Sequence, residues 1–331
     1  DRVAFEMGVA QLLDGKRAEA EKTFQTVVTR FPQSNRTADA WFEIGEARFE
    51  AEAWDDAATA YTNVITAAGD APAAAAFLEQ ARHKRAWAFA MKQDHAAAAK
   101  AFAEQLRQHP SGRLAADGQA LLGESLFQAG DYAAASGPLA AALADPAKLS
   151  SDELRGLALI RAGECAARER DWKKSLALAE QLARTQPDSP YAPQARYAAA
   201  WARQNLGQLD QALAAYRALA EGGRTEIAAR ARLMEGEVLF EQGNHKDAIK
   251  AFFKVAYGFG EQQAPPVFHL WQAQATYEAA RCFEAIGERG QAIKLYAELV
   301  DRYPDSAQTP AGRQRLEALG STPAAQGKRS S

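Results

Sequence analysis

Residues 7–32 read MGVAQLLDGKRAEAEKTFQTVVTRFP, and this stretch contains the pattern that decides the fold. An apolar residue precedes the small residue Gly8, a second glycine, Gly15, marks a turn, and an alanine and a phenylalanine follow. The same pattern occurs eight times, at intervals of 36 to 44 residues. Its small residue is in turn Gly8, Gly45, Ala86, Gly123, Gly163, Ala200, Gly236 and Ala280. Self-similarity at such a period predicts a stack of repeated structural units.

The residues of one copy predict two antiparallel helices, which we call helix A and helix B. Small side chains at the Gly8 and Ala20 positions let the two backbones approach closely, and the ring of Phe24 covers the gap between them. Glycine suits the left-handed residue that ends a helix. We expect this conformation at Gly15, Gly130, Gly207, Gly243 and Gly287. Proline cannot continue a helix, so the prolines at positions 32, 110, 187 and 304 predict the ends of helices B.

The pattern resembles the tetratricopeptide repeat, a helix–turn–helix unit of about 34 residues. The resemblance covers residues 1–305 and implies an all-α fold, a right-handed α-solenoid of eight repeats in a single domain over residues 1–320. We expect a short capping helix at 310–319 and a flexible tail at 321–331. The repeats are expected near residues 1–34, 38–70, 73–112, 114–146, 152–188, 192–222, 225–260 and 265–305.

The composition argues against several functional classes. The chain has 331 residues, of which 47% are hydrophobic and 24% charged, and its formal net charge is −3. Nucleic-acid-binding proteins need a basic face, so we expect no nucleic acid partner. No apolar run approaches the length of a membrane-spanning helix, so we expect no membrane span. Cys165 and Cys282 fall in helices A of separate repeats and are predicted to be core thiols.

The sequence contains no recognisable catalytic or metal-binding motif. Its five histidines include no pair spaced as in HExxH. Nucleophile elbows, phosphate-binding glycine loops and dinucleotide fingerprints are also missing. We therefore predict that the protein is not an enzyme and uses no cofactor or metal.

In tetratricopeptide proteins helix A lines the concave face, and the resemblance implies that three positions of each helix A contact a partner. The aromatic and charged residues at these positions are Phe5, Phe42, Glu46, Phe49, His83, Trp87, Glu124, Phe127, Glu164, Tyr197, Trp201, Glu237, Phe240, Tyr277 and Arg281. Exposed aromatic side chains are typical anchors for a protein segment, extended or helical. In the structural alternative, the glutamates pair with arginines of adjacent repeats and the rings fill a tightly wound superhelix. Both interpretations stay open at the level of sequence.

The longest insertion, residues 256–276, supplies a second candidate site. It contains Phe259, Phe268 and Trp271 around two prolines, and Pro265 is expected to begin a long helix A. These aromatic residues either form a lateral binding site or pack on the seventh repeat.

Four joints between repeats share a proline that is followed within two residues by a serine. They read FPQSNRTADAWFEIGE (31–46), HPSGRLAADGQALLGE (109–124), QPDSPYAPQARYAAAW (186–201) and YPDSAQTPAGRQRL (303–316). The joints are similar to repeats of two families of the bacterial envelope, the Tol–Pal-associated periplasmic coordinators and the outer-membrane assembly lipoproteins. The likeness implies a bacterial scaffold of the periplasm or cell envelope, with a cytoplasmic location as the alternative.

The sequence thus predicts a non-catalytic scaffold that binds a protein segment along helices A and leaves the oligomeric state open. Two other functions are compatible with it. The chain is alternatively the helical scaffold of a larger enzyme, such as a cell-wall lyase. The third possibility is a solenoid that binds glycan or peptidoglycan along Trp87, Trp201 and Tyr197.

Overall fold

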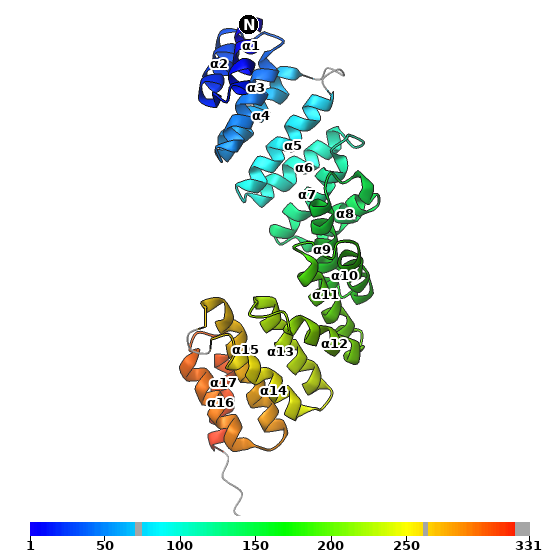
Figure 1. The fold of residues 1–331 in the computed structure, drawn as a ribbon, viewed down its shortest axis with the longest axis vertical. Coiled ribbons are helices and arrows are strands. Elements are labelled where there is room, and N and C mark those ends of the chain that lie inside the picture. The colour runs from blue at the N-terminus through cyan, green and yellow to red at the C-terminus, as the bar shows by residue number, and fades with distance from the viewer. Residues whose placement is uncertain (70–74, 261–263, 322–331) are drawn as a thin grey trace, which may run out of the picture. The chain divides into compact units, whose positions relative to one another are not determined.

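A computed structural model describes residues 1–69, 75–260 and 264–321 of the chain. In these residues the structure consists of seventeen α-helices and one short 3₁₀ helix and has no β-strand, which confirms the predicted all-α class. Figure 1 shows the helices following one another in pairs. The predicted tail, from residue 322 onward, lies outside the described residues.

Each range predicted for a repeat corresponds to one pair of helices, A and B, and the second pair begins at Thr37, one residue before its predicted range. In the first four repeats the pairs are α1 (Arg2–Leu13) and α2 (Arg17–Arg30), α3 (Thr37–Glu50) and α4 (Trp54–Ala68), α5 (Ala75–Met91) and α6 (His95–Gln108), and α7 (Ala115–Gln128) and α8 (Tyr132–Leu143), which η2 (Pro146–Lys148) follows. In the last four they are α9 (Asp152–Arg168) and α10 (Trp172–Thr185), α11 (Ala192–Asn205) and α12 (Leu209–Ala220), α13 (Glu226–Glu241) and α14 (His245–Ala256), and α15 (Pro266–Ala285) and α16 (Arg289–Arg302). The predicted capping helix is α17 (Thr309–Ser321).

The contacts between residues divide the chain into two compact units, residues 1–170 and 171–331. The division falls between α9 and α10, the two helices of the fifth repeat. Within each unit, helices that are adjacent in the sequence pack against each other. Each unit is therefore a stack of neighbouring helices, as a repeat protein requires.

The turn from helix A to helix B has the same backbone geometry in all eight repeats. Seven residues after the small residue, one residue adopts a positive φ, between 56° and 84°. This confirms the left-handed conformation expected at five glycines. Three residues that are not glycine, namely Glu52, Gln93 and Arg170, adopt the same conformation. Because a Cβ atom strains this conformation, the repeat architecture imposes it at these three positions.

In the first, second and seventh repeats the glycine of helix A lies directly against a ring of helix B, which follows it by sixteen positions. A Cβ atom added to Gly8 would lie 2.6 Å from the Phe24 ring, and one added to Gly236 would lie 2.5 Å from the Phe252 ring. In the fourth repeat Leu139 takes the place of the ring. Phe24, Phe252 and Leu139 are fully buried. The predicted close approach of the two backbones is therefore confirmed.

The four proline-containing joints end helix B in the same way. Helices α2, α6, α10 and α16 each end two residues before the proline. The intervening residue has φ between −130° and −138° and ψ between 55° and 63°. The proline ring displaces the residue before it from the helical region. The prolines therefore terminate helix B, as predicted.

Two further expectations concern the core and the membrane. Cys165 of α9 and Cys282 of α15 are buried free thiols, which confirms that they are core residues. Throughout the described part of the chain, no helix combines the length and the apolar character that a membrane crossing requires.

Candidate functional site

The residues predicted to contact a partner differ widely in exposure. Trp87 and Trp201 are exposed, at 38% and 36%, and so is Arg281. His83 and Tyr197 are buried. The others are half-buried: Phe5, Phe42, Glu46, Phe49, Glu124, Phe127, Glu164, Glu237, Phe240 and Tyr277. Among the aromatic residues of this set, the most accessible are therefore Trp87 and Trp201, one in each unit.

In the first unit, Trp87 of α5 lies beside an aromatic and a basic side chain. The ring centroids of Phe49 and Trp87 are 5.8 Å apart. The Nζ atom of Lys84 lies 5.4 Å from the Phe49 centroid and 5.8 Å from the Trp87 centroid. The same atom lies 2.9 Å from a carboxylate oxygen of Glu46. Helices α3 and α5 thus supply a mixed aromatic and cationic surface, which we call the Trp87 surface: Phe49, Lys84 and Trp87.

His83, one turn before Trp87 on α5, is a packing residue. Its Nδ1 atom lies 3.0 Å from Oε1 of Gln105, and its ring centroid lies 5.5 Å from that of Phe102. Burial lowers the pKa of His83 below its usual value, so the ring is neutral near pH 7. A buried, neutral and hydrogen-bonded histidine offers no contact to a partner. We therefore remove His83 from the predicted contact residues.

The recurring glutamates of helices A form bonds within the protein. Arg161 donates two hydrogen bonds to Glu124, of 2.7 and 3.2 Å, and one of 2.9 Å to Glu164. Its guanidinium carbon lies 4.5 Å from the centroid of the Phe127 ring. Glu46 likewise bonds to the next repeat, through Lys84. These contacts are the pairing between repeats that the structural interpretation of the glutamates expects.

In the second unit, Trp201 of α11 packs against Trp172 of α10. Their ring centroids are 5.1 Å apart and their planes make an angle of 72°, an edge-to-face contact. Tyr197, one turn earlier on α11, is buried, and the guanidinium carbon of Arg230 lies 4.2 Å from its ring centroid. Burial raises the pKa of Tyr197 to about 12. We therefore remove Tyr197 from the contact residues and from the glycan path, and call the pair Trp172 and Trp201 the Trp201 surface.

Glu237 of α13 is a poorly solvated carboxyl group. Its Oε1 atom accepts a hydrogen bond of 3.4 Å from Gln274. Burial raises its pKa to about 7, with a further contribution from the charges of Glu278 and Glu241, although Arg281 acts in the opposite direction. Glu237 is therefore only partly charged near neutral pH, which makes it a weak contact for a basic partner.

The aromatic residues of the insertion pack on the seventh repeat. Phe268 is 7% exposed and lies in a cluster with Ala229 of α13. The ring centroids of Phe259 and Phe268 are 4.8 Å apart, in a stacked arrangement. Trp271 donates a hydrogen bond of 3.3 Å from Nε1 to Glu226, also of α13. Phe268 is thus a packing residue, whereas Phe259 and Trp271 are half-buried and the lateral binding site stays a prediction for them.

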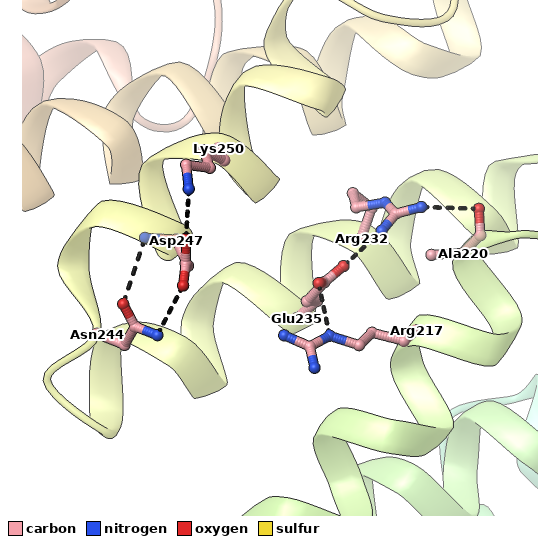
Figure 2. Close-up of polar contacts among 7 residues, drawn as sticks. All are labelled: Arg217, Ala220, Arg232, Glu235, Asn244, Asp247 and Lys250. Atoms are coloured by element: carbon pink, nitrogen blue, oxygen red, sulfur yellow. Dashed lines mark hydrogen bonds and ion pairs between the residues drawn. The ribbon is translucent and has the colours of Figure 1, made fainter.

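Sequence reasoning missed a buried ion-pair group between α12 and α13. Glu235 is 7% exposed and accepts hydrogen bonds from Arg217 at 3.0 Å and from Arg232 at 2.7 Å (Figure 2). Arg232 also donates to the backbone carbonyl of Ala220 at 3.4 Å. The second repeat has Ile44 at the position of Glu235. An acidic residue at an apolar position of the pattern was the signal that could have revealed this group.

The predicted contact residues include paired carboxylates and partly accessible rings. Among the residues that the structure describes, no group of three or more His, Cys, Asp or Glu side chains is placed to hold a metal ion. Glu46, Glu124 and Glu164 are engaged in ion pairs within the protein. Trp87 and Trp201 leave part of their rings accessible, at 38% and 36% exposure.

The protein is similar to solved structures of helical proteins. The apo form of RapI matches with a TM-score of 0.54 and 12% sequence identity, over 91% of this chain and 81% of that one. PilF of Pseudomonas aeruginosa matches with a TM-score of 0.49 and 15% identity, over 72% of this chain and 97% of that one. The C-terminal part of a TPR repeat-containing protein of Cytophaga hutchinsonii matches with a TM-score of 0.46 and 13% identity, over 93% and 98%. At such low identity the RapI match shows the fold alone.

The family is shown by the repeats themselves. Comparison with curated proteins gave no match. A tetratricopeptide repeat model matches residues 5–72 and 197–265, and a second one matches residues 274–306. Together these matches cover about half of the chain. The matched helix pairs have their turn and core residues at the same spacing from the small residue. The chain therefore belongs to the tetratricopeptide repeat family.

Proposed function

We propose that this protein is a non-catalytic scaffold that binds a segment of a partner protein on the surface of its helices A. Tetratricopeptide repeats imply a scaffold for protein–protein interaction, and the proposal adds the binding face. The observation that carries it is the exposure of Trp87 and Trp201, at 38% and 36%. Large aromatic side chains that stay accessible beside a polar rim are typical anchors of protein interfaces.

The Trp87 surface favours an apolar side chain of the partner. The rings of Phe49 and Trp87 supply apolar contact, and the nearby ammonium group of Lys84 disfavours a partner cation. The ion pair with Glu46 at 2.9 Å holds Lys84 in place and neutralises part of its charge. An extended or helical segment with one apolar anchor residue fits this chemistry.

We further propose that the scaffold works in the bacterial cell envelope. The support is the likeness of its proline–serine joints to envelope repeats. Fractionation of the source cells, followed by immunoblotting, tests the location. Recovery in the cytoplasmic fraction alone would contradict it.

Quantitative affinity capture from the source cells tests the binding face. We compare the wild-type protein with Trp87→Ala and Trp201→Ala, and we expect at least one of them to lose about tenfold or more in affinity for a captured partner. Ile286→Ala is the matched control, because Ile286 is also exposed, at 37%, but lies outside the predicted contact positions. Circular dichroism verifies that each variant is folded.

Recovery of the same partners at the same yield with both tryptophan variants would refute the proposed face. Binding to purified peptidoglycan that quenches tryptophan fluorescence and requires Trp87 or Trp201 would instead favour the glycan alternative. A partner lost from the tryptophan variants and retained by Ile286→Ala would support the scaffold.

A further inference from the structure

We infer that a groove in the second unit binds an acidic segment of a partner protein. The groove has a volume of about 580 Å³ and is formed by α10, α11 and α12. Its lining includes Arg184, Arg196, Arg203 and Glu180, with Ala199 and Leu219 among the apolar residues. A volume of this size lies in the usual range of ligand sites, about 300–1,000 Å³.

The groove has an excess of positive charge. It contains three arginines and a single carboxylate, in a chain whose net charge is −3. The Nη2 atom of Arg203 lies 2.6 Å from Glu180, and Arg196 donates to the backbone carbonyl of Pro187 at 3.3 Å. Within the described residues, Arg184 has no side-chain hydrogen bond or ion pair. Arg184 and Arg203 also suit the C-terminal ends of α10 and α11, because each lies in the last turn of its helix. Arg196 lies in the first half of α11, away from any helix C-terminus.

Packing does not require arginine at the groove positions of α11. Arg196 and Arg203 lie four residues before and three residues after Ala200, the small residue of this helix A. The first position holds Ala4, Trp41, Arg82, Gln119, Leu159, Arg232 and Thr276 in the other repeats. The second holds Gln11, Arg48, Phe89, Leu126, Ala166, Leu239 and Phe283. No other repeat has arginine at both positions, so this pair exceeds what the stacking of repeats needs.

Arginine in a groove favours a carboxylate-bearing partner. The planar guanidinium group presents paired donors that match the two oxygens of a carboxylate. Arg184 and Arg196 have donors without an acidic partner in the described residues, whereas Arg203 is held by Glu180. The groove therefore has room for two or more partner carboxylates. The small side chains of Ala199, Ala215 and Ala218 leave space for the backbone that carries them.

The groove is separate from the Trp201 surface. Arg203 follows Trp201 by two residues on α11, and two residues correspond to about 200° around a helix. The two side chains therefore point to opposite sides of the helix. Failure of the Trp87 and Trp201 surfaces to bind a partner would leave this inference intact, and the reverse is also true.

Fluorescence anisotropy at low ionic strength tests the inference on the full chain. The probe is a fluorescein-labelled peptide with four glutamates separated by serines, and its counterpart has glutamines instead. We expect binding of the glutamate peptide, weakened by added salt, and little binding of the glutamine peptide. Arg184→Glu and Arg196→Glu should each weaken binding by about five- to tenfold. Lys173→Glu is the matched control, because Lys173 is exposed on α10 outside the groove and undergoes the same change in charge.

A gain of affinity gives the sharpest readout. Glu180→Gln removes the carboxylate that competes for Arg203, so the glutamate peptide should bind about two- to fivefold more tightly. A misfolded variant cannot produce such a gain.

Several outcomes would overturn the inference. They are equal binding of the two peptides, a loss with Lys173→Glu as large as with Arg196→Glu, and weaker binding after Glu180→Gln. Tighter binding of a single-stranded oligonucleotide that displaces the glutamate peptide would assign the groove to nucleic acid instead, and binding of inorganic phosphate without the peptide would assign it to a small anion.

Discussion

At the scale of single residues, each repeat depends on a few positions with a fixed spacing. The small residue of helix A approaches the ring sixteen positions later, as Gly45 approaches Tyr61, where an added Cβ atom would lie 2.7 Å from the ring. The residue seven positions after the small residue must adopt the left-handed conformation, with a positive φ. Glycine satisfies both requirements without strain, and where other residues stand the protein accepts a cost. The spacing within a repeat therefore predicts which substitutions at these positions stabilise the protein and which destabilise it.

Gln93→Gly should stabilise the protein by about 1 kcal/mol. Gln93 is exposed and adopts φ of 66°, so the substitution removes the strain of a left-handed residue that has a Cβ atom. The greater freedom of glycine in the unfolded chain offsets part of the gain. Gly130→Ala is the reverse change at the equivalent position of the fourth repeat, where no atom lies within 4 Å of an added Cβ, and it should destabilise by a similar amount. Urea unfolding measures both, and stabilisation by Gly130→Ala would contradict the argument.

Phe102→Ala should lower the free energy of unfolding by about 3–5 kcal/mol. The Phe102 side chain is fully buried, and its removal leaves a cavity beside His83, whose ring centroid lies 5.5 Å away. Phe102→Leu is the matched control, because Leu139 fills the same position in the fourth repeat. It should cost only about 1 kcal/mol. Equal losses from the two variants, measured by denaturant unfolding, would show that the volume of the ring is not what stabilises the repeat.

At the scale of helices, the pattern of small residues, turns and prolines predicts the pairs well because packing and backbone geometry restrict the residue types. Helix α15 begins at Pro266, one residue after the proline expected to start it. The exposure of individual side chains was less predictable. Tyr197 and Phe268 are buried because Arg230 and Ala229 of α13 lie against them, and a residue pattern does not record such contacts. The left-handed turns at Glu52, Gln93 and Arg170 were not predicted, because these residue types do not indicate a strained backbone conformation.

Contacts between helices also give the stability a dependence on pH. The pKa of Glu237 is raised to about 7 in the folded protein, from 4.5 in its ordinary state, with burial as the main cause. The folded state therefore keeps a proton that the unfolded state releases as pH rises from 4.5 towards 7. The stability contributed by this carboxyl group falls through that window and is lost above pH 7.

Glu237→Gln should thus raise the free energy of unfolding by about 2 kcal/mol at pH 8 and leave it nearly unchanged at pH 4.5. The amide keeps an oxygen that can accept the hydrogen bond from Gln274. Urea unfolding at the two pH values measures the difference. Glu221→Gln, at an exposed acid whose charge does not contribute to the shift of Glu237, controls for the loss of one charge. An equal effect of Glu237→Gln at both pH values would show that its proton is not linked to folding.

At the scale of the whole molecule, the sequence predicts the repeat architecture because every copy has its small residue and its turn at the same spacing. The two compact units, which divide within the fifth repeat, have no comparable signal in the sequence. Gly163 and Ala179 stand at the two core positions of that repeat, where the first repeat has Gly8 and Phe24. Near the division, the pattern departs at Ala179, which replaces a ring, and at Arg170, which replaces the turn glycine.

We expect a destabilising substitution in one repeat to affect mainly the repeats next to it. In a repeat protein each unit contacts only its neighbours, so local opening does not require global unfolding. Phe252 is fully buried, and Phe252→Ala should increase amide hydrogen exchange in α13 to α16 of the second unit while α1 to α4 keep their protection. Phe24→Ala, at the same position of the first repeat, should give the reciprocal result. Hydrogen exchange followed by mass spectrometry measures both, and a uniform increase along the chain in either variant would show that the repeats unfold as one cooperative body.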